Sequence, residues 1–382
     1  MSQVPPVDLA QQYQNLRTEL DTAVLEVLAS GRYIGGSPVE GFEQQFANYL
    51  HIPECVACNS GTDALYLALR ALEIGPGDEV ITSPFTFIAT TEVISAIGAV
   101  PIFVDIDIRT FNLDVEQVEA AITEKTRAII PVHLFGQAVD MTRLMEIAQA
   151  HHLAVIEDCA QATGAEWAGQ PVGTIGHVGC FSFFPTKNLG ACGDGGAITT
   201  RDPAIADRVR MLREHGSRQR YLHEEIGVNS RLDAVQAVIL QVKLRHLPAW
   251  NEQRRTIAER YTEFLSHIPG LMVPYEHPEG RSVWNQYTIR LQPNGAEGGA
   301  DPAYRDRVRS DLQKQGVIAM VYYALPLHLQ PVYRSLGYAA GSFPATEEAA
   351  HQVLSLPMFP DLSIEQQDQV IDSLKDCLVQ NQ

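Results

Sequence analysis

One lysine in this chain has the surroundings of a reactive amine. Lys187 follows the apolar run Phe181–Phe184 and precedes a turn-rich segment with glycines at positions 190, 193, 195 and 196. Glycine-rich backbone can approach a ligand closely. A lysine amine in a partly apolar pocket loses its charge readily, and the neutral amine can form a Schiff base. Taken alone, the pattern is more often that of a surface lysine on a hairpin, so the rest of the chain has to decide.

Length and charge narrow the classes of function. The chain has 382 residues and a formal net charge of −18. The length predicts a large domain plus a smaller one. The acidic balance disfavours nucleic acid as a partner, because proteins hold nucleic acid mainly by neutralising its phosphates with Lys and Arg. It also means that a phosphorylated ligand needs a local pocket of donors against the overall field.

The sequence shows no sign of export or of membrane insertion. No segment is apolar for long enough to span a bilayer, and residues 1–9 lack the basic start and apolar run of a secretory signal. The six cysteines form no framework, and Cys55 and Cys58 have no second pair at zinc spacing. We therefore expect a reduced, cytoplasmic protein with no metal site and no membrane partner.

Strands and helices alternate over the first half of the chain. Apolar runs and helical periodicity predict strands at 80–82, 100–104, 128–132 and 153–156, with helices at 86–97, 114–122 and 140–151. Strands separated by helices of this length predict an α/β fold with a mostly parallel sheet covered on both faces. Ligands of such sheets bind beyond the carboxyl ends of the strands.

Aromatic and polar residues stand where these strands end. Phe85 or Phe87, after the first of them, could stack on a flat ring. Asp158 and Gln161 follow the last, where a carboxylate and an amide can grip two edges of a heteroaromatic ring. Each residue alone has a simpler explanation: turn formation for Asp158, core packing for Phe87 and a solvated loop for Gln161.

A phosphate site is indicated at the start of a helix. Ser60, Gly61 and Thr62 open a strongly apolar helix, where free N–H groups and the helix dipole suit a phosphate; plain capping by Ser60 or Thr62 is the alternative. Ser182 lies on the face of its strand opposite the two neighbouring phenylalanines and is available as a further donor. Together with the aromatic plate, the carboxylate, the amide and the amine, these residues describe a pyridoxal phosphate site.

Eight motifs, spread over nearly the whole chain, can be compared with known families. They are Ser60–Ala64, Phe85–Thr90, Glu157–Gln161, Phe181–Gly190, Arg213–Gly216, Gly227–Gln236, Pro326–Gln330 and Leu354–Pro360. Together they resemble the DegT/StrS family of nucleotide-sugar aminotransferases, which have the type I fold of aspartate aminotransferase. One branch of that family has histidine in place of the lysine and performs dehydration. This chain keeps the lysine, so the resemblance implies an aminotransferase.

The resemblance implies roles for the residues around the cofactor ring. Lys187 would form the Schiff base with the aldehyde of pyridoxal phosphate, and Asp158 would pair with the pyridine nitrogen. Gln161 would hydrogen-bond the ring hydroxyl. Phe87 would stack on the ring, although some relatives have Trp or Tyr at that position.

The resemblance also implies how the phosphate is held. Gly61, Thr62 and Ser182 would bind it within one subunit, and Asn229 would reach it from the neighbouring subunit. The active unit is then a homodimer with shared active sites. His328 and His133 are candidates for contact with the substrate, because one follows Pro326 in a loop that faces the cleft in relatives and the other follows a strand at the cofactor end of the sheet. A packed histidine explains each of them equally well.

The family implies two half-reactions at one site, with ping-pong kinetics. L-glutamate would give up its amino group and leave as 2-oxoglutarate, and a keto-deoxy sugar linked to a nucleotide would take up the nitrogen. The product would serve deoxyamino-sugar and polysaccharide biosynthesis, such as that of lipopolysaccharide O-antigen. The motif Phe85–Thr90, taken with Val132–Gly136, favours branches that act on 3-keto sugars over those that act on 4-keto sugars.

The second half of the chain predicts a smaller α+β domain. We expect a large cofactor-binding domain at 1–248, whose N-terminal helix at 15–29 packs on the small domain, and a small domain at 249–382. The periodicity predicts helices at 202–215, 231–246, 250–268 and 302–315, strands at 285–289 and 316–322, and a Gly-rich turn around 293–300. The loop 216–223 is rich in Arg and His and could meet a pyrophosphate or a partner subunit, or be a solvated loop.

Two other classes of function are open to a chain of this kind. A pyridoxal phosphate enzyme could catalyse elimination or desulfuration, but no cysteine stands out as a persulfide carrier. A regulatory protein that binds DNA would need a helix-turn-helix segment with Arg and Lys, which the acidic sequence lacks.

Overall fold

A seven-stranded sheet forms the centre of the larger part of the molecule. The computed structural model describes residues 3–293 and 302–381, so the Gly-rich turn expected around 293–300 lies, beyond Pro293, outside the described residues. The strand order is β1 (Glu54–Cys58), β9 (Gly196–Thr200), β8 (Val178–Ser182), β5 (Ala154–Asp158), β4 (Thr126–Ile130), β2 (Glu79–Thr82) and β3 (Val100–Phe103). β9 is antiparallel to both of its neighbours, while β8, β5, β4, β2 and β3 pair in parallel. The predicted mostly parallel sheet is confirmed.

Both faces of this sheet are buried, which explains why its strands read as continuous apolar runs. Successive residues alternate between the two faces: Ile81 and Ile129 belong to one hydrophobic core, and Val80, Ala128 and Ile130 belong to another. The first core is completed by α2 (Ser37–Leu50), α5 (Met141–Ala150) and α7 (Ala234–Leu265). The second is completed by α3 (Gly61–Ala71), α4 (Ala89–Ala96) and α6 (Pro203–Arg213).

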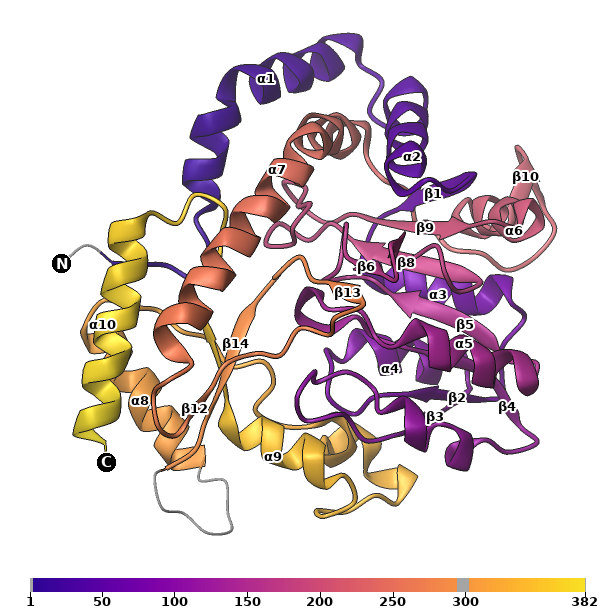
Figure 1. The fold of residues 1–382 in the computed structure, drawn as a ribbon. Coiled ribbons are helices and arrows are strands. Elements are labelled where there is room, and N and C mark those ends of the chain that lie inside the picture. Colours follow the sequence, from indigo (N-terminus) through magenta and orange to yellow (C-terminus); the bar gives the residue numbers. More distant parts are fainter. Residues whose placement is uncertain (1–2, 294–301, 382) are drawn as a thin grey trace.

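A third, separate core lies at the other end of α7. It contains the C-terminal half of that helix and the three-stranded sheet β12 (Leu271–Met272), β14 (Tyr287–Leu291) and β15 (Val353–Leu356), together with α8 (Pro302–Lys314) and α10 (Ile364–Gln380). Val4 belongs to this core and forms a parallel bridge with Val317. In Figure 1, α7 runs between the large sheet on the right and α8 and α10 on the left.

The N-terminal helix packs along α7. α1 (Leu9–Ser30) buries Leu16 and Leu20 against Ile239, Val242 and Trp250. Asp8 caps its start by accepting a hydrogen bond from the N–H of Gln11, at 2.8 Å. No helix among the described residues combines the length and the apolar composition needed to cross a lipid bilayer.

Three elements differ from the prediction. α7 is one helix and continues through Pro248, because Leu247 and Trp250 on either side are buried and hold the helix together across the missing N–H. The domain boundary that we propose near residue 248 therefore falls inside a helix. The expected strand at 316–322 is reduced to single bridges, Val4 with Val317 and Met320 with Ser355, because its residues pair with two different partners.

The expected helix at 114–122 consists instead of two 3₁₀ turns, Val115–Gln117 and Glu119–Ala121. Its two buried valines, Val115 and Val118, are three residues apart, which matches the three residues per turn of a 3₁₀ helix. The spacing of the apolar residues did not distinguish a 3₁₀ helix from an α-helix.

Candidate active site

Asp158 is the last residue of β5 and lies almost fully buried at the carboxyl end of the parallel strands. Its Oδ2 accepts a hydrogen bond from the hydroxyl of Thr90, at 2.8 Å, and its Oδ1 accepts one from the N–H of Ala160, at 3.1 Å. Burial raises the pKa of the Asp158 carboxyl, and the bond from Thr90 opposes this shift. The structure thus places a carboxylate with two donors at the strand end, and α4 supplies the hydroxyl.

Lys187 lies in the loop after β8, the strand next to β5. In that pairing Asp158 stands opposite Cys180, two residues before the end of β8. Burial lowers the pKa of the Lys187 amine to about 8, and the negative charge of Asp158 opposes the shift. The neutral form, which nucleophilic attack on an aldehyde requires, is therefore far more populated at physiological pH than in an ordinary lysine.

Gln161 is buried with its amide fixed at both ends. Its Oε1 accepts a hydrogen bond from the N–H of Phe135, at 2.7 Å, and its Nε2 donates to the hydroxyl of Tyr323, at 3.3 Å. The backbone N–H can only donate, so it determines which end of the amide is the oxygen. Gln161 consequently presents its NH₂ group, a donor, on the side of Tyr323.

Phe87 is the aromatic residue expected to stack on the ring of the cofactor. Its side chain is 55% exposed, whereas Phe85 is 1% exposed and packs in a core with Phe111 and Phe135. The Phe87 ring lies 6.4 Å from the ring of Tyr323, tilted by 36°. Phe87 thus has a free face for a flat ligand.

The start of α3 forms a cradle with Ser182. Ser60 caps the helix by accepting from the N–H of Asp63, at 3.1 Å. A Cβ atom on Gly61 would stand 2.5 Å from the Cβ of Ser182, so only glycine permits this approach. The first N–H groups of the helix, among them those of Gly61 and Thr62, have no partner within the helix and suit an anion.

Asn229, expected to reach a phosphate from the neighbouring subunit, has an exposed side chain. Its backbone forms an antiparallel bridge with Glu214. The next residue, Ser230, is buried, and its hydroxyl lies 3.4 Å from the N–H and 3.3 Å from the Oδ1 of Asn59. The side chain of Asn229 is therefore free to meet a ligand or a second subunit.

The structure corrects the expectation for His133. The residue is fully buried; its Nδ1 accepts a hydrogen bond from the N–H of Val139, at 3.1 Å, so its proton lies on Nε2 and is donated to Glu157, at 3.0 Å. Both ring nitrogens are used inside the protein, and neither is left for a substrate. The position after the strand correctly predicted the end of the sheet at which His133 lies, but not the direction of its side chain.

His328 is also 1% exposed. Its Nε2 lies 3.0 Å from Glu347 Oε1, its ring packs edge-on against Phe343, and only its Nδ1 lacks a partner. Burial lowers the pKa of this imidazole, and Glu347 opposes the shift. Its position therefore supports packing under the small domain, which the sequence left as the alternative to contact with sugar.

One group of possible metal ligands occurs among the described residues: His133, Glu157 and Cys159, whose ligand atoms lie within 4.8 Å of one another. The Glu157 carboxylate already accepts hydrogen bonds from His133 and from the backbone N–H groups of 173, 175 and 176, at 2.7 to 3.0 Å. These donors use the oxygens that a metal ion would need. The group is a hydrogen-bond network.

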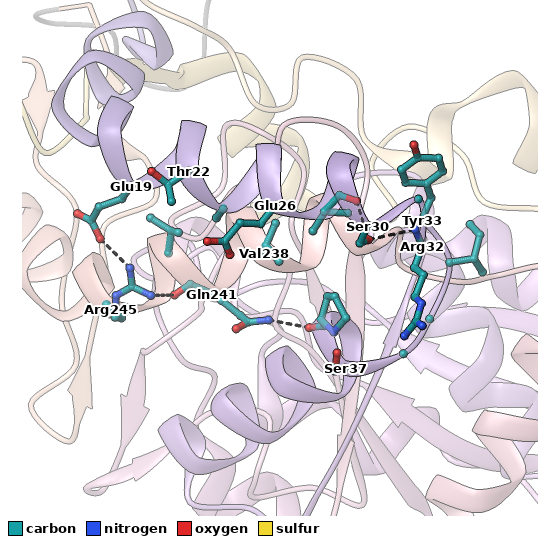
Figure 2. A pocket seen from close by; sticks show the side chains of 18 of the residues that line it. Glu19, Thr22, Glu26, Ser30, Arg32, Tyr33, Ser37, Val238, Gln241 and Arg245 are labelled. Carbon is teal, nitrogen blue, oxygen red and sulfur yellow. Dashed lines mark hydrogen bonds and ion pairs between the residues drawn. The ribbon is translucent and has the colours of Figure 1, made fainter.

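A wide cavity lies elsewhere in the described part of the chain. It has a volume of about 1280 Å³ and lies between α1, the start of α2 and α7, and none of the residues expected to hold the cofactor lines it. Figure 2 shows Gln241 bonded to the carbonyl of Pro38 and Arg245 bonded to Glu19 across it. This cavity is a groove along α1, separate from the residues around Lys187.

A model of the DegT/DnrJ/EryC1/StrS aminotransferase family matches residues 14–375. The chain belongs to this family. It is 50% identical to a protein of Geobacillus stearothermophilus named a pleiotropic regulatory protein, and the match covers 97% of each chain. It is 47% identical to the UDP-N-acetyl-3-dehydro-α-D-glucosamine 3-aminotransferase of Acidithiobacillus ferrooxidans, over 95% of each. It is 45% identical to the dTDP-3-amino-3,4,6-trideoxy-α-D-glucose transaminase of Streptomyces venezuelae, over 98% of this chain and 96% of that protein.

Solved structures agree with this assignment. The structure of S. venezuelae DesV with a ketimine intermediate superposes with a TM-score of 0.94, 45% identity and 99% coverage of both chains. A putative sugar aminotransferase of Streptococcus pneumoniae in its pyridoxal phosphate form superposes with a TM-score of 0.89 and 29% identity, over 96% of this chain and 97% of that one. The protein is an aminotransferase of a family that depends on pyridoxal phosphate.

The residues present fit that cofactor. The cradle that a Cβ on Gly61 would fill, a lysine whose pKa is about 8 and a carboxylate with a fixed hydroxyl donor correspond to the phosphate, the aldehyde and the ring nitrogen. Two neighbours of the site, Thr90 and Tyr323, escaped the sequence reasoning. Thr90 is the last residue of the motif Phe85–Thr90, three residues beyond Phe87. Tyr323 comes from the small domain, so no local pattern links it to Gln161.

Proposed function

We propose that this protein transfers an amino group from L-glutamate to a keto-deoxy sugar attached to a nucleotide. The observation that carries the proposal is the pairing of a Lys187 amine of lowered pKa with Asp158 at the carboxyl ends of adjacent parallel strands. The names of the relatives from S. venezuelae and A. ferrooxidans support the class of acceptor, since both act on nucleotide-linked sugars.

Each side chain of the site has a separate task in this reaction. The cofactor, when bound, supplies an aldehyde that accepts the amino group and a ring that withdraws electrons. With the cofactor bound, the Nζ of Lys187 would hold its aldehyde carbon, and as a free amine it would accept the proton from the Cα of the amino donor. Asp158 holds a proton on the ring nitrogen, and Thr90 keeps that carboxylate charged and oriented.

The remaining residues hold and orient the cofactor. The NH₂ group of Gln161 donates to the ring hydroxyl oxygen, and the free face of Phe87 covers one side of the ring. Gly61, Thr62 and Ser182 bind the phosphate through the N–H groups at the start of α3 and the serine hydroxyl. This local set of donors offsets the unfavourable field of a chain with net charge −18.

We propose a 3-keto sugar as the acceptor, in preference to a 4-keto sugar. The printed names of the relatives from S. venezuelae and A. ferrooxidans place the amino group at C3, the first with dTDP and the second with UDP. The product would feed the biosynthesis of deoxyamino sugars and of polysaccharides such as O-antigen. The six cysteines, all free, fit the reducing cytoplasm, which we propose as the location.

The active unit that we propose is a homodimer in which Asn229 serves the phosphate of the second subunit. Two observations support it: the exposed side chain of Asn229 and the exposure of large apolar side chains that a partner would cover, such as Leu25, Ile34, Tyr221 and Ile226, at 53 to 84%. In the hairpin of β10 (Ser217–Gln219) and β11 (Leu222–His223), Arg220 has no carboxylate partner among the described ion pairs and lies over the ring of Tyr221. It is therefore available to a pyrophosphate.

The decisive experiment combines spectroscopy with product analysis. The protein with cofactor should show an absorption band near the violet that glutamate bleaches, with release of 2-oxoglutarate, and a 3-keto nucleotide sugar should restore the band. Lys187→Ala should lose both the band and transamination, whereas Lys375→Ala, in a polar stretch of α10, should keep both. A Lys187→Ala variant with undiminished turnover would refute the proposal, and bleaching without 2-oxoglutarate would indicate elimination instead.

Hybrid dimers test the shared site. Lys187→Ala and Asn229→Ala subunits, mixed and allowed to exchange, form hybrids with one fully intact site only if Asn229 acts across the interface. Random exchange should then recover about one quarter of the wild-type activity. If Asn229 acts within its own subunit, mixing recovers nothing.

A further inference from the structure

Asn188, the residue after Lys187, has every polar group of its side chain hydrogen-bonded inside the protein. Asn188 is 4% exposed; its Nδ2 donates to the Oδ1 of Asn251, at 2.8 Å, and to the carbonyl of Val283, at 2.9 Å. Its Oδ1 accepts from the Nδ2 of Asn285, at 2.7 Å. Both hydrogens and the oxygen of the amide are therefore used, and its solvation has been replaced entirely by protein.

The direction of these bonds is fixed by backbone carbonyls. The carbonyl of Val283 can only accept, so the atom of Asn188 that faces it is nitrogen. The carbonyl of Thr163 accepts from the Nδ2 of Asn251, at 3.1 Å, so the oxygen of Asn251 faces Asn188. The three amides form a relay that runs from Asn285 through Asn188 and Asn251 to Thr163.

The relay connects the two loops that hold the two edges of the cofactor. Asn188 follows Lys187 directly, and Thr163 stands two residues after Gln161. Asn251 lies on α7, which borders both cores, and Asn285 lies shortly before β14 of the small domain. The position of the Lys187 amine relative to the amide of Gln161 is thus set through α7 and the small domain.

The backbone around Lys187 has little freedom apart from this anchor. A Cβ atom on Gly190 would stand 2.3 Å from the carbonyl oxygen of Pro185, so the loop closes tightly on itself. The buried amine of Lys243 donates to the carbonyl of Gly190, at 2.7 Å. No hydrogen bond of the Lys187 amine occurs among the described residues, so the anchor on Asn188 has to place it.

We infer that Asn188, acting with Asn251 and Asn285, is a positioning residue that sets the place of the Lys187 amine relative to Asp158 and Gln161. The inference rests on the proposed role of Lys187. It gives the small domain a part in the reaction besides that of Tyr323, because one bond of the relay comes from Asn285. A misplacement of about 1 Å at a reacting group can lower a rate about 10²-fold.

The test uses the dimeric protein with its cofactor and two readouts. Asn188→Ala should shift the pH midpoint of the violet band and slow the glutamate half-reaction about 10- to 100-fold, with KM for glutamate changed less than kcat. Asn285→Ala removes only one bond and should move both readouts in the same direction by a smaller factor. The control is Asn48→Ala, because Asn48 is exposed and accepts a single bond, from Gln44 at 3.0 Å.

The combination of variants separates positioning from mere folding. Asn188→Ala with Asn251→Ala should lose less than the product of the single losses, because the two residues belong to one relay. If Asn188→Ala does not fold, Asn285→Ala carries the same test. The inference is overturned if a folded Asn188→Ala or, failing that, Asn285→Ala keeps the band midpoint and the half-reaction rate of Asn48→Ala. A violet band that persists in Lys187→Ala would instead refute the proposed function.

Discussion

Glu157 and Asp158 are consecutive buried carboxylates on β5, and their surroundings give them different roles. Glu157 accepts hydrogen bonds from His133 and from three backbone N–H groups, which satisfies both oxygens. Asp158 accepts hydrogen bonds from Thr90 and from one backbone N–H, and its negative charge raises the pKa of the Lys187 amine. Alternation along the strand sends the first side chain into the scaffold and the second toward the cofactor end.

The difference shows that surroundings, not residue type, assign the role. A carboxylate with four donors has both oxygens occupied and holds the turn at 173–176 against the sheet. A carboxylate with two donors in an apolar setting retains an edge for a ligand, and burial raises its pKa. Changes on the two sides of β5 should therefore have separable effects on stability and on activity.

The largest effect is expected from Asp158→Asn. The amide cannot hold a proton on the ring nitrogen by charge, so transamination should fall about 10³-fold. The free energy of unfolding should change by less than about 1 kcal/mol, because the shape is kept and a buried charge is lost. Steady-state kinetics and urea unfolding measure the two quantities. If Asp158→Asn lost stability and kept its activity, Asp158 would be a structural residue and the proposed role would be wrong.

Glu157→Gln should show the converse pattern. Its NH₂ group would face backbone donors in place of an oxygen, and the loss of charge-assisted bonds should lower the free energy of unfolding by about 3 kcal/mol. The glutamate half-reaction of the protein that remains folded should stay within about threefold of wild type. Glu40→Gln, on the exposed side of α2, is the matched control and should leave stability unchanged.

The lowered pKa of Lys187 predicts how the cofactor-free protein reacts with pyridoxal phosphate. Only the neutral amine attacks, so the rate should rise about tenfold per pH unit below pH 8 and level off above it. The charge of Asp158 raises the pKa of the amine, so in Asp158→Asn the plateau should begin at lower pH. Stopped-flow absorbance measures this; a rate that does not vary between pH 6 and 8 would contradict it.

The smallest effect is expected from Thr90→Val, which removes one donor from Asp158 and keeps the shape. The bond lowers the pKa of Asp158, so its loss should raise that pKa and move the acidic limb of the kcat profile to higher pH. Turnover at neutral pH should fall about tenfold, which corresponds to one hydrogen bond to a charged group. Thr90→Ser keeps the donor and should behave as wild type; equal profiles for the two variants would exclude the role of Thr90.

The order of elements and the residues at the strand ends follow from the sequence. Period-two burial on both faces requires apolar strands such as Ala128–Ile130, and parallel strands bring their carboxyl ends to one edge. That is why Asp158 and the segment of Lys187 could be placed together without coordinates. The fold class could be predicted because it depends on local periodicity repeated many times.

The directions of individual side chains and their distant partners were decided only by the tertiary structure. His133 follows a strand at the expected end of the sheet, yet both of its ring nitrogens form hydrogen bonds inside the protein, with Val139 and Glu157. Tyr323 and Asn285 reach the site from the small domain, more than 95 residues from their partners Gln161 and Asn188. A hydrogen bond between residues so far apart leaves no periodic trace, because it depends on how two cores are fastened to one helix.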